Sequence, residues 1–234
     1  LVMAQPDHNA GRWALTPAWE GCDTLLELYQ QCGAPPSYRA TVPVLVDPKT
    51  RTLLGNDSAP LVDLLNRWPH HDEVVDLAPA EATDRIQAWQ HRLQPAINDG
   101  VYRCGFARNQ AAYDRAEADL FAALDAVEQS LETNGPWLCG KALTLADVRL
   151  FPTLIRWELV YAPLFGCSRQ PLWQYPNLWE WRQRFYRLPG VADTCDGNAW
   201  RNDYFGALFP LNPGGIVPAG PDLSTLVNST ASSG

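Results

Sequence analysis

The sequence TVPVLVD, residues 41–47, is apolar and largely β-branched, which predicts a buried strand. Pro43 lies inside this run, although a proline cannot donate a hydrogen bond to a β-ladder. The run is therefore compatible with an edge position, or with a turn that contains a cis peptide bond between Val42 and Pro43.

A second strand, a turn and a helix are expected directly after this stretch. The strand is predicted over residues 51–54, and the turn sequence Gly55-Asn56-Asp57-Ser58 leads into a helix with Pro60 in its first turn. The free N–H groups and positive end of a helix attract a carboxylate, and an acidic side chain beside them can bind an ammonium group. Such a unit is also common as a purely structural element, so the pattern alone leaves both interpretations open.

The composition predicts one large or two small globular domains. The chain has 234 residues, of which 46% are hydrophobic and ten are tryptophan, and this is enough for a full core with aromatic packing. The net charge of −8 disfavours nucleic acid and anionic membranes as partners. The longest apolar run, residues 150–165, contains Arg156 and Glu158, so we expect neither a membrane span nor a signal peptide.

The six cysteines are scattered, without a CxxC pair or the Cys/His spacing of a metal site. A chain of this size does not need disulfides, so a reduced, cytoplasmic protein without a bound metal is predicted. His70 and His71 are adjacent in a segment that indicates a linker, residues 69–79. Neighbouring side chains of an extended segment point in different directions, and this disfavours a shared metal ion.

The two ends of the chain give weaker signals. A short strand is expected over residues 1–4, a loop over 5–15, and a helix over 23–31 with Leu25, Leu28 and Tyr29 on one face. The segment from Pro218 onward is rich in Ser, Thr and Gly and is predicted to be disordered.

Helical periodicity begins near Ala80. The expected helices run from about residue 81 toward 97, from 109 or 110 to 132, from 145 onward, and from 176 through 185. Thr144 is predicted to cap the third of these in a capping box with Asp147, which makes Asp147 a buried cap and not a catalytic acid. We therefore expect a first domain over residues 1–78, an all-helical domain over 79–210 and an extended tail over 211–234.

Four stretches of the sequence point to a known protein family. They are GVYRCGFA at residues 100–107, DVRLF at 147–151, LIRWELVY at 154–161 and NPGGIVP at 212–218. Together they resemble the glutathionyl-hydroquinone reductases, which are the xi-class glutathione transferases. The likeness extends from about Leu1 to Pro221. It implies a glutathione transferase architecture, in which an α/β thioredoxin-like N-terminal domain precedes an all-α helical C-terminal domain. It also implies glutathione as co-substrate, aromatic quinone conjugates as substrates and a homodimer; the high aromatic content also favours the dimer.

The resemblance further implies a mechanism. In that family a cysteine thiolate attacks the sulfur of a glutathionyl-hydroquinone, the hydroquinone leaves, and a second glutathione resolves the mixed disulfide. The leaving carbon needs a proton donor, for which Tyr102 is the matching residue. Tyr161 and Tyr204 match the two tyrosines that favour the thiolate. Without the resemblance, each of the three would be interpreted as a half-buried aromatic residue with its hydroxyl at water.

Glutathione contacts are implied in the first domain. The residue before the cis-proline offers its backbone to the cysteine part of glutathione, and an acidic residue followed by Ser holds the γ-glutamyl end. The matching positions are Trp13, Arg39, Ala40, Thr41, Val42, Asp57 and Ser58. Asp57 stands where the family usually has Glu, so the side chain reaches less far but keeps its charge.

The sequence departs from the family at the nucleophile. The family's cysteine lies in a Cys-Pro-Trp motif at the first strand-helix turn, and the 234 residues contain no such motif. Because the likeness begins at the family's second strand, we expect an incomplete thioredoxin-like domain with unpaired backbone groups, an open core and no reductase activity. Cys22 is a poor substitute because Asp23 raises its thiol pKa, and we expect Cys32 to be no better. Cys104, Cys139, Cys167 and Cys195 are assigned to packing.

Three hypotheses remain on the sequence alone. The first is a glutathionyl-hydroquinone reductase whose nucleophile lies in a segment outside these residues. The second is a non-catalytic binding or interaction protein with a glutathione transferase fold. The third is a transferase that activates glutathione with a Ser or Tyr, which would also have to lie outside these residues.

Overall fold

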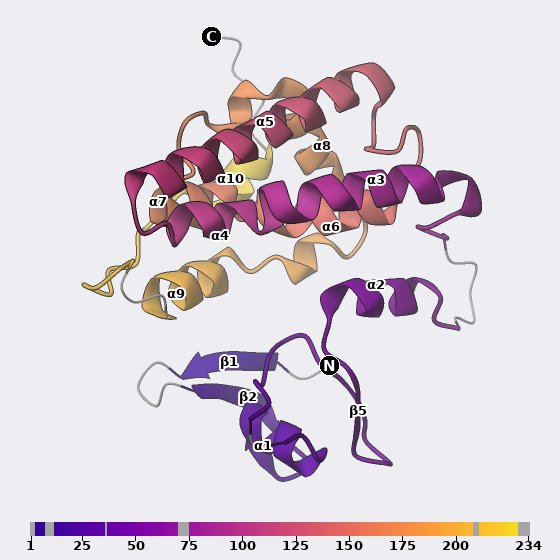
Figure 1. Cartoon of the computed structure of the whole chain (residues 1–234), viewed down its shortest axis with the longest axis vertical. Helices are drawn as coiled ribbons and strands as arrows, with labels where there is room; N and C mark the ends of the chain where they lie inside the picture. The colour runs from indigo at the N-terminus through magenta and orange to yellow at the C-terminus, as the bar shows by residue number, and fades with distance from the viewer. Residues whose placement is uncertain (1–2, 8–11, 36, 70–74, 208–210, 229–234) are drawn as a thin grey trace. The chain divides into compact units, whose positions relative to one another are not determined.

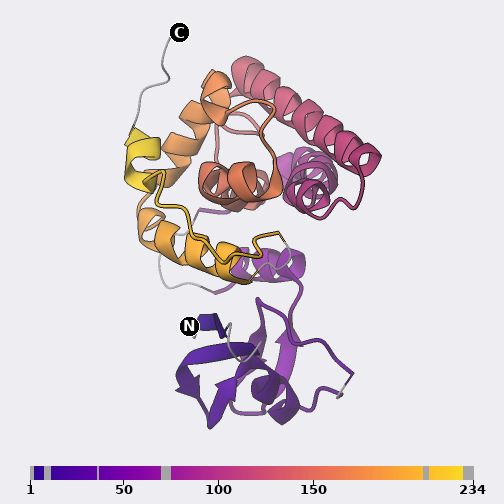
Figure 2. The ribbon, with the colours of Figure 1, turned by 90° about the vertical axis from the view of Figure 1, so that its left-hand side faces the viewer.

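The computed structural model describes residues 3–7, 12–35, 37–69, 75–207 and 211–228. The chain forms two compact units, Leu1–Asp76 (unit 1) and Leu77–Gly234 (unit 2), which are seen from two directions in Figures 1 and 2. The division falls two residues before the boundary expected from the sequence.

The described residues of unit 1 form two small antiparallel sheets and two helices. One sheet has the strand order β1-β2-β3 and the other pairs β4 with β5. The elements are β1 (Met3–Asp7), β2 (Arg12–Trp19), β3 (Cys22–Thr24), α1 (Leu25–Gln31), β4 (Leu45–Asp47), β5 (Thr52–Gly55) and α2 (Ser58–Asn66).

The loop expected over residues 5–15 is wrong, because this segment forms most of a hairpin. β1 pairs with β2 from Met3 opposite Thr16 to Asp7 opposite Arg12. Only Leu15 of β2 is buried, so the burial along the strand does not alternate as it does in a half-buried strand. Pairing with β1, and not local propensity, decides its conformation.

Helix α1 begins two residues later than predicted, at Leu25. Thr24 is its N-cap: the hydroxyl of Thr24 accepts from the backbone N–H of Glu27 at 3.2 Å. The Glu27 carboxylate in turn accepts from the backbone N–H of Thr24 at 3.0 Å, which completes a capping box. The predicted apolar face, with Leu25, Leu28 and Tyr29, is buried as expected.

The opening stretch is a strand only over its last three residues, in β4. The Val42–Pro43 peptide bond is cis, as one of the two alternatives proposed. Residues 41–44 stay outside the ladder for a physical reason: Pro43 has no N–H to donate, and the carbonyl of Thr41 instead accepts from the Tyr29 hydroxyl at 2.7 Å.

The two sheets of unit 1 are not joined to each other within the described residues. A cavity of about 560 Å³ lies between α1, the end of β2 and the segment that leads into β4. Its lining is apolar and consists of Ala4, Leu15, Trp19, Leu25, Leu28, Val42, Pro43, Val44, Leu45 and Val46. Unit 1 therefore has an apolar groove beside its core.

Within its described residues, unit 2 consists of helices joined by loops, with one isolated β-bridge between Trp137 and Gly140. Its elements are η1 (Ala80–Ala82), α3 (Thr83–Leu93), η2 (Gln94–Asn98), α4 (Gly100–Gly105), α5 (Gln110–Asn134), α6 (Leu145–Ile155), η3 (Trp157–Tyr161), α7 (Ala162–Phe165), η4 (Leu172–Gln174), α8 (Pro176–Tyr186), η5 (Ala192–Thr194), α9 (Gly197–Ala207) and α10 (Leu223–Asn228). Of these, η2 and η3 are π-helical turns. Among the described residues, no helix is both long and apolar enough to cross a membrane.

Helix α6 is the centre of unit 2, and it contacts α3 on one side and α8 on another (Figure 1). The predicted capping box is present at its start. The Asp147 carboxylate is fully buried and accepts four hydrogen bonds, from Leu138 N, Thr144 N, Thr144 Oγ1 and Trp181 Nε1, at 2.8–3.0 Å. Asp147 is therefore a structural anchor that ties three segments together.

Two further expectations need correction. The helix predicted from residue 81 toward 97 is divided into η1, α3 and η2, because Pro95 cannot donate a backbone hydrogen bond and the chain widens into a π-turn around it. The tail is neither wholly extended nor disordered from Pro218 onward, because residues Leu223–Asn228 form the helix α10. Val227 of this helix is buried, and its carbonyl accepts from Arg187 Nη2 at 3.2 Å. The prediction of disorder for residues 229–234 lies outside the described residues.

Candidate functional site

Three tyrosine hydroxyls form a cluster in unit 2, and each comes from a different element. Tyr102 lies on α4, Tyr161 ends the π-turn η3, and Tyr204 lies on α9. The Tyr204 hydroxyl is 2.7 Å from that of Tyr102 and 3.1 Å from that of Tyr161. The structure thus brings together the three tyrosines that the sequence analysis selected, across 102 positions of the chain.

The tyrosines of the cluster differ in their exposure to solvent. Tyr161 is 3% exposed, whereas Tyr102 is 37% exposed. Burial raises the pKa of Tyr161, and the neighbouring hydroxyls of Tyr204 and Tyr102 raise it further. Burial and Tyr204 also raise the pKa of Tyr102, an effect that the positive charge of Arg156 partly opposes. Both phenols are therefore protonated at neutral pH, and the Tyr102 side chain is the more accessible of the two.

Phe165 fixes the tyrosine rings from one side. Its ring centroid lies 5.2 Å from that of Tyr102, 5.4 Å from that of Tyr161 and 6.2 Å from that of Tyr204. Gly105 makes this packing possible, since a Cβ at that position would lie 2.5 Å from the Phe165 ring. Sequence reasoning missed Phe165, because its role depends on three residues distant in the chain.

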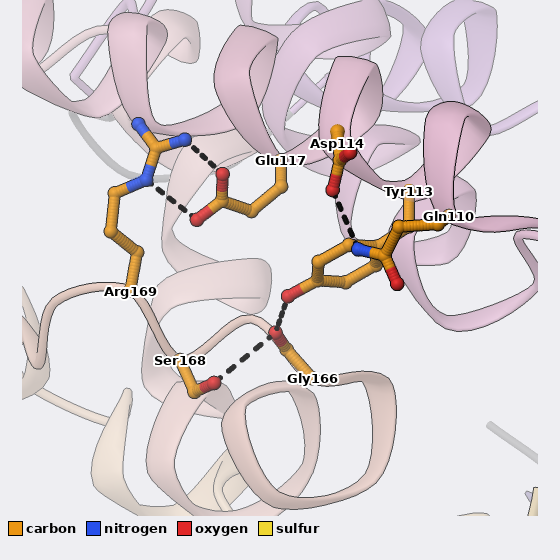
Figure 3. Close-up of polar contacts among 7 residues, drawn as sticks. All are labelled: Gln110, Tyr113, Asp114, Glu117, Gly166, Ser168 and Arg169. Atoms are coloured by element: carbon orange, nitrogen blue, oxygen red, sulfur yellow. Dashed lines mark hydrogen bonds and ion pairs between the residues drawn. The ribbon is translucent and has the colours of Figure 1, made fainter.

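The segment after Phe165 is held by helix α5 (Figure 3). The Tyr113 hydroxyl donates to the carbonyl of Gly166 at 2.6 Å. Arg169 forms a two-pronged ion pair with Glu117, in which its Nε lies 2.6 Å from Oε1. These contacts secure the end of α7, and with it the aromatic ring against which the tyrosines pack.

Arg156 stacks on Trp200, which lies on the same helix as Tyr204. The guanidinium of Arg156 lies 4.5 Å from the ring centroid of Trp200, which is one turn before Tyr204 on α9. Arg156 also donates to the carbonyl of Pro152 at 2.6 Å. The positive charge of Arg156 lowers the pKa of Tyr102, against the larger effect of burial.

The candidate glutathione residues lie in unit 1 and form three groups: Trp13, residues 39–42, and Asp57 with Ser58. Asn56 links the second group to the third. The Asn56 side-chain amide donates to Thr41 Oγ1 at 3.2 Å and to the Tyr29 hydroxyl at 3.3 Å. Asn56 directly precedes Asp57, so the stretch before the cis-proline and the start of α2 are held next to each other. Val42 is 49% exposed, which leaves its backbone approachable.

Asp57, and not Ser58, is the N-cap of α2. Its carboxylate accepts from the backbone N–H of Ala59 at 3.0 Å, and both Asp57 and Ser58 are exposed. Arg39 is also exposed, and Ala40 is half-buried. Trp13 lies on β2 opposite Pro6, and among the described residues no side-chain hydrogen bond joins it to either of the other two groups. Sequence reasoning missed Tyr29 and Asn56, which position Thr41, because neither carries a motif.

The six cysteines are all free, and those of unit 1 are poor nucleophiles. Burial raises the pKa of Cys22, and Glu27 raises it further. Burial also raises the pKa of Cys32. Neither residue lines the groove beside Pro43. In unit 2, Cys104 and Cys167 are buried free thiols. A hydrogen bond between them, together with burial, raises the pKa of Cys167. No group of side chains within the described residues could hold a metal ion.

The fold and the tyrosine cluster agree with what comparison with known proteins finds. A model of the glutathione S-transferase C-terminal domain matches residues 110–184. The chain is 38% identical over 207 residues to the glutathionyl-hydroquinone reductase PcpF of Sphingobium chlorophenolicum, covering 86% of this chain and 64% of that protein. It is 36% identical over 219 residues to the glutathionyl-hydroquinone reductase YqjG of Escherichia coli, covering 89% of this chain and 66% of that protein.

Solved structures of similar proteins have the same fold as this chain. The glutathione-bound structure of YqjG matches with a TM-score of 0.83 at 33% identity, covering 90% of this chain and 72% of that chain. A xi-class transferase from Natrialba magadii matches with a TM-score of 0.84 at 34% identity, covering 90% of this chain and 67% of that chain. The fold is therefore that of a glutathione transferase. The chain belongs to this family, in the xi class with the glutathionyl-hydroquinone reductases, and spans about two thirds of the length of the curated relatives it matches.

Proposed function

We propose that this chain acts with glutathione in the reduction of glutathionyl-hydroquinones to hydroquinones. The observation that supports it most is the hydrogen-bonded cluster of Tyr102, Tyr161 and Tyr204, with Tyr102 both protonated and exposed. A relative named as a glutathionyl-hydroquinone reductase at 38% identity supports the same reaction.

The proposed reduction proceeds in two steps. A cysteine thiolate attacks the sulfur of the thioether, an S–S bond forms, and the carbon–sulfur bond breaks with its electron pair moving to the ring carbon. Tyr102 donates the proton that this carbon takes up, so hydroquinone leaves. A glutathione thiolate then attacks the mixed disulfide, which releases glutathione disulfide and the enzyme thiolate. One glutathionyl-hydroquinone and one glutathione thus become one hydroquinone and one glutathione disulfide.

The nucleophile in this proposal belongs to a Cys-Pro-Trp segment that is not among the 234 residues. The apolar groove of about 560 Å³ between the two sheets of unit 1 supports it, because one more apolar strand could pair with β4 and fill the groove. The raised pKa values of Cys22 and Cys32 argue against either as a replacement.

The test compares hydroquinone release by the 234-residue chain with that of a chain extended at its N-terminus by a Cys-Pro-Trp strand and helix. We expect turnover only from the extended chain, and a loss of about a hundredfold or more in extended Tyr102→Phe. Tyr186→Phe, which changes a tyrosine outside the cluster, should retain full activity. Turnover by the 234-residue chain that Cys22→Ser or Cys32→Ser abolishes would overturn the placement of the nucleophile.

Glutathione is proposed to bind unit 1 through Trp13, the segment 39–42 and the start of α2. The Asp57 carboxylate is proposed to take the ammonium of the γ-glutamyl end. Calorimetry should therefore show weaker glutathione binding for Asp57→Ala than for the unaltered chain. Asp63→Ala, on the same helix, serves as the control. Equal binding by Asp57→Ala and the unaltered chain would show that the γ-glutamyl assignment is wrong.

A non-catalytic role is the second candidate, favoured by the lack of a cysteine in the groove lining. It predicts that the extended chain binds glutathione without releasing hydroquinone, so the same assay separates the two. The protein is further proposed to be a cytoplasmic homodimer. The free state of all six cysteines supports the location, and a monomeric mass by light scattering at micromolar concentration would contradict the dimer.

A further inference from the structure

Arg182 is a buried cation in the core of unit 2. It lies on α8, is 1% exposed, and its guanidinium is 4.1 Å from the ring centroid of Trp179. A guanidinium is always charged, and removing it from water costs several kcal/mol unless polar groups replace the water. A buried arginine of this kind therefore needs a structural reason.

The hydrogen-bond partners of Arg182 lie on one short stretch of the chain, residues 154–158. Its Nη1 donates to the Glu158 carboxylate at 2.5 Å and to the carbonyl of Leu154 at 3.2 Å. Leu154 is the penultimate residue of α6, and Glu158 lies in the π-turn η3. One guanidinium thus bridges the junction at which an α-helix changes into a π-helix.

The pairing is incomplete, which argues against a role in stability alone. Arg182 Nε and Nη2, Glu158 Oε1 and Trp157 Nε1 are buried without a hydrogen-bond partner. An ion pair selected for stability would satisfy these atoms, and an apolar replacement of similar volume is often as stable. What the pair does provide is a fixed geometry for η3.

The residue at the end of η3 is Tyr161. It lies three positions after Glu158, and its hydroxyl is held 3.1 Å from that of Tyr204. A π-turn has one more residue per hydrogen-bonded ring than an α-turn, so its loss would rotate the following side chains. We infer that Arg182 is a positioning residue for Tyr161: by bridging Leu154 and Glu158 it maintains the π-turn that aims the Tyr161 hydroxyl at Tyr204. The inference rests on the proposed role of the tyrosine cluster.

The test follows tyrosine hydroxyls by NMR with ¹³Cζ-labelled tyrosine, which needs no turnover. Signals are assigned with Tyr161→Phe, Tyr204→Phe and Tyr175→Phe. In Arg182→Met we expect the Tyr161 and Tyr204 signals to shift by more than a linewidth, while Tyr175 at the start of α8 stays in place. Arg184→Met removes a more exposed arginine two positions along the same helix, and should move none of them.

A double variant separates positioning from stability. Arg182→Met leaves the Glu158 carboxylate buried and unpaired and should lower the melting temperature, or prevent folding outright. Arg182→Met combined with Glu158→Leu removes both charges, so the melting temperature should recover while the Tyr161 signal stays displaced. Arg182→Lys keeps the positive charge but not the planar guanidinium, and it should displace the Tyr161 signal less than Arg182→Met does.

Two outcomes would overturn the inference. One is an unchanged Tyr161 signal in the folded double variant, which would reduce the pair to a structural role. The other is an equal displacement of Tyr175 and Tyr161, which would indicate general loosening of α8. Because the readout is spectroscopic, a failure of Tyr102 or Tyr161 to contribute to turnover would leave this test valid and count only against the proposed function.

Discussion

Unit 1 and unit 2 differ in how completely they are packed. Among the described residues of unit 1, the hydrophobic core has five buried members, and it opens onto a groove of about 560 Å³. Unit 2 is built around α6, which is buried almost all round, with an aspartate fixed by four hydrogen bonds at its start. The three clustered tyrosines are therefore held in a closed scaffold, whereas the cis-proline segment lies in an open one.

The largest expected effect tests the difference in packing. Leu124 on α5 is fully buried in unit 2, and Leu28 on α1 borders the groove of unit 1. Leu124→Ala should lower the free energy of unfolding by about 3–5 kcal/mol, because it opens a cavity in a closed core. Leu28→Ala should cost about half as much, since part of its side chain already faces empty space and makes fewer contacts there.

Urea denaturation of both variants, followed by circular dichroism and tryptophan fluorescence, measures the difference. Leu26→Ala, which changes an exposed leucine of α1, is the control and should unfold like the parent chain. Equal costs for Leu124→Ala and Leu28→Ala would break the comparison and show that the groove is filled in solution.

The next effect compares two helix-capping aspartates. Asp147 caps α6 from a fully buried position, and Asp57 caps α2 from the surface. Asp147→Ala strands several buried donors, and at about 1 kcal/mol or more for each the loss should reach about 3 kcal/mol. Asp57→Ala loses one exposed cap, which is worth about 1 kcal/mol.

Thermal denaturation of the two variants, each against the parent chain, measures this pair. Asp147→Asn provides a further control, because it keeps the shape and one acceptor oxygen and should fall between the parent and Asp147→Ala. A loss for Asp57→Ala as large as that for Asp147→Ala would contradict the ranking.

The smallest effect is a pH dependence located in unit 2. The folded-state pKa of Tyr161 is raised above its unfolded value near 10, mainly by burial. Stability from this group is therefore complete below about pH 10 and is lost as the pH rises further, with a slope of at most about 1.4 kcal/mol per pH unit. Tyr161→Phe should make the fall in melting temperature above about pH 10 shallower.

Melting temperatures measured at several pH values on both sides of that point test the prediction. Tyr38→Phe, which changes an exposed tyrosine of unit 1, should keep the alkaline slope of the parent chain. A slope that is the same in Tyr161→Phe as in the parent would show that other groups cause the alkaline sensitivity.

The sequence alone determined the parts of this protein that depend on local patterns. The three-and-four periodicity of α5, the Thr144–Asp147 capping box and the start of α8 at Pro176 were all predictable, because caps and amphipathic faces are written in neighbouring residues. The motifs around Tyr102 and Tyr161 identified the family by resemblance, which the comparisons confirm.

Tertiary structure decided the rest, because the deciding contacts join residues distant in the chain. β2 pairs with β1 over five residue pairs, although only Leu15 of its eight residues is buried. Phe165 packs against three tyrosines from three elements, and Arg182 bridges Leu154 and Glu158 from another helix. Packing of this kind is a property of the folded chain, since no segment alone contains both sides of the contact.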